Sequence, residues 1–175
     1  HESGNPVNQQ LRCGVAGAGI AGLAVASFLA QEGHRVEVFE KRRQLAPVGA
    51  GLLLQATGLA ALSALGLMPS VLTAGSPITR LSGQTAAPHS KAVFNLSYGR
   101  LAAGLHGLGI HRARLYECLR ARAAGFENVM ITTAAEAASL EEDHSGRPWL
   151  ILGGGTRHGP YDVLIDASGM HSALR

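Results

Sequence analysis

Three closely spaced glycines near the N-terminus constrain the fold of this chain more than any other feature. Gly17, Gly19 and Gly22 form the pattern G-x-G-x-x-G, directly after the apolar residues 13–16 and at the start of the alanine-rich residues 20–31. This order predicts a strand, a tight turn and a helix. In such a unit the first glycine makes the turn, the second lets the backbone approach a pyrophosphate, and the third lets the helix pack close to the strand. The helix N-terminus adds unpaired N–H groups and a positive dipole end, which attract phosphate.

An acidic residue follows at the distance that a dinucleotide site requires. Residues 36–39 form a second apolar run that ends in Glu40, about 20 residues after the glycine turn. A carboxylate there can accept hydrogen bonds from a ribose diol. The charge-free residues 13–31 could also form a transmembrane span or the apolar core of a signal peptide. Four glycines in the first ten of these residues, and the β-type run just beyond, favour a dinucleotide site and no membrane span.

Composition and charge narrow the class of protein. The 175 residues are 46% hydrophobic and 15% charged, which allows a buried core and excludes a disordered chain. The net charge of +3 comes from scattered basic residues, whereas a protein that binds nucleic acid usually shows a dense basic stripe. Cys13 and Cys118 lie in apolar patterns, which predicts two buried thiols in a reducing compartment and hence a cytoplasmic protein. Residues 1–10 predict a flexible polar leader, and residues 11–175 the fold itself.

The rest of the chain predicts a mixture of helices and strands. Helices are expected at residues 58–65, with Thr57 as the N-cap, and at 69–74 and 112–124. A short buried strand is expected at residues 52–54, and further strands at 129–132, 137–142, 149–152 and 161–167. Residues 78–85 and 91–97 are expected to form a hairpin, and a turn into a helix start is expected from residue 168. The predicted fold class is α/β: a Rossmann-like domain with a parallel sheet, helices on both faces and an antiparallel β addition. The β excursion near residues 76–100 is a candidate part of a substrate domain.

Three further motifs occur in a specific order along the chain. They are the glycines Gly49 and Gly51 after Glu40, the segment from Gly109 to Arg112 at the start of the long helix, and residues 162–175, which read DVLIDASGMHSALR. Together with the N-terminal glycines they resemble the FAD-dependent aromatic hydroxylases, the single-component flavoprotein monooxygenases typified by p-hydroxybenzoate hydroxylase. The resemblance runs from about residue 11 to residue 175. It implies the FAD-binding domain from the N-terminal part of such an enzyme.

The resemblance implies a set of cofactor-binding residues: Gly17, Gly19, Gly22, Glu40, Lys41, Arg42, Arg112, Ser168 and Gly169. The three N-terminal glycines hold the FAD pyrophosphate, Glu40 binds the adenosine ribose, and Arg42 lies near the adenosine end. By the same resemblance, Arg112 reaches FAD from the side. A guanidinium can pair with two phosphate oxygens. A cation at a helix N-terminus is disfavoured unless an anion lies nearby, which favours this role for Arg112. Ser168 stands where the family usually has an aspartate. A serine can hydrogen-bond a ribose or ribityl hydroxyl but brings no charge. We therefore expect the replacement of the aspartate by serine to affect the binding of NAD(P)H more than the binding of FAD. Asp166 is expected to be a structural acid at a strand end.

The resemblance also implies the reaction. In this family NAD(P)H reduces FAD, oxygen reacts with the reduced flavin, and one oxygen atom passes to an activated ring of a small organic substrate. The sequence nominates no catalytic acid or base and no metal ligands; His106, His111 and Asp162 are better explained as structural residues. Members of the family are longer and continue with a substrate-binding sheet. The remainder of the substrate domain is therefore expected in a missing C-terminal half or a partner chain.

Alternatives remain open. The chain could belong to another FAD-dependent oxidoreductase or a halogenase of the same superfamily, although the single tryptophan, Trp149, does not lie in the W-x-W-x-I-P segment that halogenases usually carry. It could be a truncated flavin-binding module without catalysis. An ordinary NAD dehydrogenase is the weakest alternative, because the segment from Gly109 to Arg112 does not fit its usual alternation of strands and helices.

Overall fold

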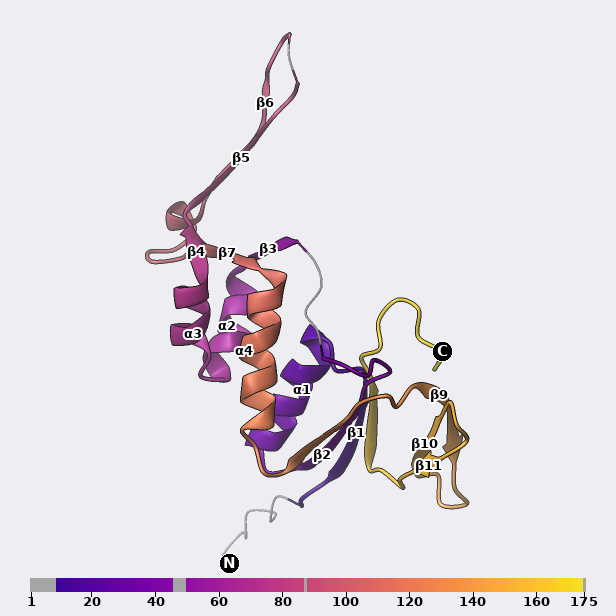
Figure 1. Ribbon diagram of the computed structural model, residues 1–175. Coiled ribbons are helices and arrows are strands. Elements are labelled where there is room, and N and C mark those ends of the chain that lie inside the picture. Colours follow the sequence, from indigo (N-terminus) through magenta and orange to yellow (C-terminus); the bar gives the residue numbers. More distant parts are fainter. Residues whose placement is uncertain (1–8, 46–49, 87, 175) are drawn as a thin grey trace, which may run out of the picture. The chain divides into compact units, whose positions relative to one another are not determined.

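Residues 9–45, 50–86 and 88–174 are described by the computed structural model, and they divide into two units (Figure 1). The first unit comprises His1–Ala46 and Leu119–Arg175, and the second comprises Pro47–Cys118. Helix α4 (Arg112–Ala124) begins in the second unit and ends in the first. Most of the predicted leader, and Gly49 of the predicted glycine loop, lie outside the described residues.

The first unit is built on a parallel sheet of four strands in the order β12-β1-β2-β8. Its strands are β1 (Arg12–Ala16), β2 (Arg35–Phe39), β8 (Val129–Thr132) and β12 (Val163–Asp166). Helix α1 (Ile20–Gln31) contacts β1 and β2 and buries Leu23, Ala26 and Ala30 at helical spacing. The predicted strand, glycine turn, helix and second strand are therefore confirmed, as is the α/β class.

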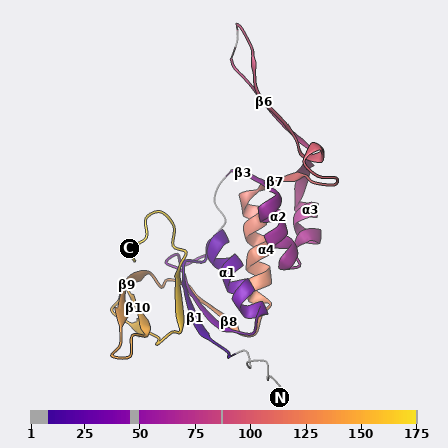
Figure 2. The same cartoon turned by 180° about the vertical axis from the view of Figure 1, so that it is seen from behind.

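An antiparallel sheet, and not the predicted second layer of helices, covers the opposite face of β1 and β2. It contains β9 (Ala137–Glu142), β10 (Pro148–Leu152) and β11 (Arg157–His158) in the order β11-β10-β9, and both views show it on the side of β1 away from α1 (Figures 1 and 2). Phe39, Ala135, Leu150 and Tyr161 form the buried cluster on this side. With both faces covered, β1 is almost wholly buried, which explains its run of apolar residues.

A buried tyrosine explains why the first strand contains a glycine. A Cβ added at Gly14 would lie 3.0 Å from the ring of Tyr161, which has no exposed surface. The Tyr161 hydroxyl donates to Oε2 of Glu37 at 2.8 Å, and the Arg12 guanidinium pairs with the other oxygen of that carboxylate at 2.8 Å. Burial, and then the hydrogen bond to Glu37, raises the pKa of Tyr161 well above its ordinary value.

The second unit contains a small antiparallel sheet and a separate hairpin. The sheet has the order β3-β7-β4, with β3 (Gly51–Leu54), β7 (Gly107–His111) and β4 (Gly75–Ile78), and helices α2 (Ala56–Ala64) and α3 (Met68–Ala74) contact β7. The hairpin pairs β5 (Arg80–Gln84) with β6 (Ala92–Ser97), and the single-turn helix η1 (Tyr98–Arg100) follows it. The predicted hairpin and the predicted helix over residues 112–124 are confirmed.

Several local predictions were wrong. Strand β7 was not predicted, because its glycines resemble a loop, yet the strand is central and pairs on both edges. The N-cap of α2 is Gln55 and not Thr57. Strand β3 is not buried, since Leu53 keeps 39% of its surface exposed. Cys13 is buried as predicted, but Cys118 is only half-buried.

The C-terminal segment also differs from the prediction. The predicted buried strand over residues 161–167 is shorter, at 163–166, and lies at an edge of the sheet with Val163 39% exposed. Residues 168–174 form a turn, in which the Ser172 N–H donates to the carbonyl of Gly169, and no helix starts there.

Candidate functional site

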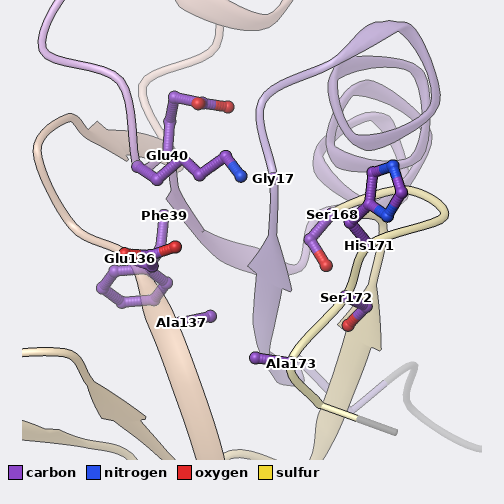
Figure 3. Close-up of a pocket in the computed structure, with 10 residues that line it drawn as sticks. Gly17, Phe39, Glu40, Glu136, Ala137, Ser168, His171, Ser172 and Ala173 are labelled. Carbon is purple, nitrogen blue, oxygen red and sulfur yellow. The ribbon is translucent and has the colours of Figure 1, made fainter.

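An open pocket lies in the first unit, where β1, β2 and β12 end. Figure 3 shows Phe39, Glu40, Glu136 and Ala137 on one side and the segment from Ser168 to Ala173 on the other, with Gly17 between them. The pocket has a volume of about 60 Å³. Its lining consists of Gly17, Phe39, Glu40, Lys41, Glu136, Ala137, Ser168, His171, Ser172 and Ala173. Carboxyl ends of parallel strands are the usual place for a ligand in an open α/β sheet.

Gly17 is required by both its conformation and its neighbours. Its φ of +98° lies in the region that favours glycine, and a Cβ there would lie 2.6 Å from the carbonyl oxygen of Ala167. Its N–H donates to the carbonyl of Phe39 at 2.7 Å. The glycine turn is thus fixed against the ends of both neighbouring strands.

Gly22 and Gly19 differ sharply in their surroundings. A Cβ at Gly22 would overlap the carbonyl oxygen of Gly17, at 1.9 Å, so this glycine lets helix α1 approach the turn. A Cβ at Gly19 would meet no protein atom within 4 Å, and its φ of −77° suits any residue. Neither packing nor backbone conformation therefore requires glycine at position 19.

Glu40 is held in place by backbone groups. Its Oε2 accepts a hydrogen bond from the N–H of Ala18 at 2.9 Å, and its Oε1 accepts one from the N–H of Arg42 at 3.0 Å. Its own N–H donates to the carbonyl of Thr132, and its carbonyl accepts from the N–H of Ala135. A carboxylate has about four lone-pair positions, so both oxygens keep capacity for a further donor.

The end of β12 supplies the opposite wall of the pocket. The hydroxyl of Ser168 donates to Oδ1 of Asp166 at 2.5 Å, and the Ser168 N–H donates to the same oxygen at 3.0 Å. The hydroxyl of Ser172 donates to Oδ2 at 2.5 Å. Gly169, which follows Ser168, has a φ of +97° and no close neighbours, so it is needed for the turn itself.

Of the three basic residues predicted to bind the cofactor, only Lys41 belongs to the lining of the pocket. Arg42 is exposed and does not line it, although its carbonyl accepts a hydrogen bond from the N–H of Ala134. Arg112 belongs to the second unit, where its N–H donates to the carbonyl of Ala50 as α4 begins. The role of each of these residues toward a cofactor stays a prediction.

Part of the lining carries no clear signal in the sequence. Phe39 was identified only as the end of an apolar run, Glu136 and Ala173 were not considered as site residues, and His171 was assigned no partner and no role. Glu136 comes directly after Ala135, whose N–H donates to the carbonyl of Glu40. This hydrogen bond joins residues that are far apart in the sequence. No local pattern indicates such a pairing. His171 had a weak signal, since it lies between Gly169 and Ser172 of the last motif.

Known proteins resemble this chain in the same region. A family described as "NAD(P)-binding Rossmann-like domain" matches residues 15–53, which include the glycine turn, α1 and Glu40. The 3-amino-4-hydroxybenzoate 2-monooxygenase of Streptomyces cremeus is 32% identical over 97% of this chain. A solved structure of 2-methyl-3-hydroxypyridine-5-carboxylic acid oxygenase in its tetrameric form matches 95% of this chain and 42% of its own chain at 32% identity, with a TM-score of 0.77. By sequence and by fold, the chain is related to the N-terminal part of the FAD-dependent monooxygenases.

The relationship to the FAD-dependent monooxygenases confirms the resemblance inferred from the four motifs. The FAD-dependent urate hydroxylase of Klebsiella pneumoniae is a further relative, 29% identical over 92% of this chain. The chain spans 42% of the length of the Streptomyces enzyme and 41% of the length of the urate hydroxylase. In the part of the chain that the structure describes, no helix has the length and hydropathy needed to cross a membrane.

Proposed function

We propose that the pocket and the adjoining glycine turn hold the ADP half of FAD. The observation that supports this most strongly is Gly19, an exposed glycine that neither the packing nor the backbone conformation of the protein requires. A ligand that approaches the backbone closely supplies the missing reason. A volume of about 60 Å³ holds only part of a nucleotide, so the rest of the ADP half would lie along the open surface at Gly19.

The residues present fit this group. The first N–H groups of α1 have no partner inside the helix, and the positive end of the helix dipole lies beside Gly19. These N–H groups would bind the pyrophosphate. Glu40 would accept hydrogen bonds from the ribose hydroxyls with its remaining lone pairs, and its two backbone bonds fix it for that role. Lys41 would bring a positive charge to the same pocket.

For the whole protein, we propose a monooxygenase that uses NAD(P)H and O₂. FAD, when bound, would supply the chemistry of electron uptake and oxygen activation. This chain's share is to bind the nucleotide half, to orient it along α1, and to fix it through Glu40. Ser168 brings no charge to the pocket, and its hydroxyl is already bonded to Asp166. We expect Arg42, Arg112 and Gly169 to complete the FAD site in the assembled enzyme.

The names of the relatives support a class of substrate. They act on 3-amino-4-hydroxybenzoate, urate and 2-methyl-3-hydroxypyridine-5-carboxylic acid, all rings that carry oxygen substituents. We propose that this protein also oxygenates an aromatic or heteroaromatic ring with hydroxyl or amino substituents. Product analysis with ¹⁸O₂ tests the reaction: one labelled oxygen atom in the product is expected, whereas halogenation or an unlabelled product would contradict it.

We also propose that the β5–β6 hairpin belongs to the substrate side of the enzyme. An isolated two-stranded hairpin is marginally stable in water, and this one exposes 67% of Val93 and 53% of Phe94. A substrate-binding sheet from sequence beyond this chain, or from a partner, would cover both. A photo-crosslinker at Phe94 in the active protein tests this: crosslinks outside residues 1–175 are expected, and crosslinks confined to residues 50–118 would contradict it.

We also propose a cytoplasmic location, which the free thiols of Cys13 and Cys118 support. Cell fractionation tests this: recovery in the cytoplasmic fraction is expected, and recovery from a secreted or periplasmic fraction would contradict it.

A matched pair of glycine variants tests nucleotide binding. Gly19→Ala introduces a methyl group that meets no protein atom within 4 Å, so the fold should keep its stability. Gly154→Ala, in the turn between β10 and β11, is the control, because its added methyl group is also free of contacts. In fluorescence titrations with FAD, Gly19→Ala should weaken affinity by about tenfold or more, and Gly154→Ala should not change it. Equal affinities in both variants would contradict the proposal.

A further inference from the structure

The turn that forms one wall of the pocket is organised by a single side chain. Asp166 ends β12, and both of its carboxylate oxygens accept hydrogen bonds from the turn that follows. Oδ1 accepts from the N–H of Ser168 at 3.0 Å and from its hydroxyl at 2.5 Å, and Oδ2 accepts from the hydroxyl of Ser172 at 2.5 Å. The carboxylate therefore connects the first residue of the turn with the fifth.

The hydrogen bonds continue from Ser172 along the chain. Its hydroxyl oxygen accepts from the N–H of Leu174 at 3.0 Å, and its N–H donates to the carbonyl of Gly169 at 3.1 Å. Leu174 in turn packs against the buried cluster that contains Phe39 and Tyr161. The conformation of the turn is thus tied to Asp166 at one end and to the core at the other.

Burial contributes little to the conformation of this turn. Ser168, Gly169 and His171 are exposed, and Met170 keeps 77% of its surface in solvent. With few apolar contacts available, hydrogen bonds decide where these residues lie. Hydrogen bonds to a charged acceptor are stronger than those between neutral groups. The bonds to the carboxylate of Asp166 therefore stabilise the conformation of this turn most.

The same turn carries much of the pocket's lining. Ser168, His171, Ser172 and Ala173 all line the pocket, opposite Glu40 (Figure 3). Asp166 does not line it. Its carboxylate therefore acts on the pocket through the residues that it holds.

We propose that Asp166 is a positioning residue for nucleotide binding. It holds the turn of residues 168–172 so that Ser168 and His171 lie against the nucleotide, with no contact of its own to the ligand. This inference rests on the proposed function and assigns to Asp166 a role in the same site.

The chain contains a matched control for this role. Asp143, in the turn between β9 and β10, also accepts from the N–H and the hydroxyl of a serine two residues later, at 2.9 and 2.6 Å from Ser145. Both sites are Asp-x-Ser turns at the end of a strand. Asp143 does not line the pocket, so its removal tests the loss of such a turn without any effect on the nucleotide.

The experiment compares Asp166→Ala and Asp166→Asn with Asp143→Ala, using ADP as the probe. Calorimetric titration should show ADP affinity reduced about tenfold in Asp166→Ala, reduced less in Asp166→Asn, which keeps one acceptor oxygen, and unchanged in Asp143→Ala. Amide NMR spectra add a readout that a general loss of stability would not produce. On addition of ADP to Asp166→Ala, the shifts at Gly19 and Glu40 should persist while those at Ser168 and His171 disappear.

The outcomes separate this inference from the proposed function. If the unmodified protein binds ADP and both Asp166 variants bind it equally well, the positioning role is wrong and the nucleotide site stands. If the unmodified protein does not bind ADP, the proposed function itself fails. Should Asp166→Ala not fold, the Asn variant decides the question, because an amide of the same size occupies the same space.

Discussion

Gly17 and Ala167 lie in direct backbone contact, although most of the chain separates them. A Cβ on Gly17 would lie 2.6 Å from the carbonyl oxygen of Ala167, and the Ala167 N–H donates to the carbonyl of Ala16 at 2.8 Å. The turn after β1 and the turn after β12 are therefore built against each other. The pocket depends on this contact, since Gly17 and Ser168 are both part of its lining.

The variant Gly17→Ala tests the importance of this contact. Its methyl group would suffer both an unfavourable φ and a clash with the Ala167 backbone, so the free energy of unfolding should fall by more than the about 1–3 kcal/mol expected for a left-handed backbone conformation alone. Gly146→Ala is the control, because Gly146 has a φ of +76° and nothing within 4 Å of the added Cβ. Urea denaturation measures both losses, and equal losses would show that the close approach is unimportant.

Replacement of Glu40 by glutamine should weaken FAD binding strongly. Glutamine keeps one carbonyl oxygen, so it cannot accept from both Ala18 and Arg42 as the carboxylate does. A hydrogen bond from a ribose hydroxyl to the charged carboxylate contributes about 1.5–3 kcal/mol, so its loss in this variant should lower affinity by about tenfold or more. Glu127→Gln, an exposed position in the same unit, is the control. Unchanged affinity in the Glu40 variant would exclude a direct role for this carboxylate.

Tyr161 should make the stability of the fold sensitive to alkaline pH. Its pKa is raised in the folded state, so the folded protein keeps the phenol proton where the unfolded chain, with a pKa of about 10, begins to lose it. This contribution to stability is complete below pH about 10 and is lost as the pH rises toward the folded-state pKa. Tyr161→Phe should be less stable by roughly 1 kcal/mol at pH 8, because the bond to Glu37 is gone.

The pH dependence of the two proteins is the measurement that checks this. Between pH 8 and pH about 10.5, the free energy of unfolding should fall more steeply in the unmodified protein than in Tyr161→Phe. The difference between the two slopes isolates Tyr161 from the lysines, which titrate in both proteins. Parallel slopes would mean that Tyr161 has the same pKa in the folded and unfolded states.

The sequence predicts the parts of this site that depend on neighbours along the chain. Gly17, Gly22 and Glu40 were found because a strand, a turn and a helix each leave a local pattern, and the structure places Gly17 and Glu40 in one pocket. Strand β7 was missed because Gly107 and Gly109 suggest a loop, whereas pairing with strands on both edges makes it a strand. For the pocket wall from His171 to Ala173, the sequence predicts the start of a helix. The hydrogen bonds of Asp166 and Ser172 decide the turn instead, and they depend on side-chain geometry that periodicity does not reveal.

The most direct test of the central claim is an NMR titration of the chain of 175 residues with FAD. The proposal predicts that the amide signals of Gly19, Ile20 and Glu40 shift as FAD is added, that excess ADP competes for the same shifts, and that the signal of Gly154 does not move. An absence of shifts at saturating FAD, or shifts confined to residues away from the glycine turn and the pocket, would contradict it.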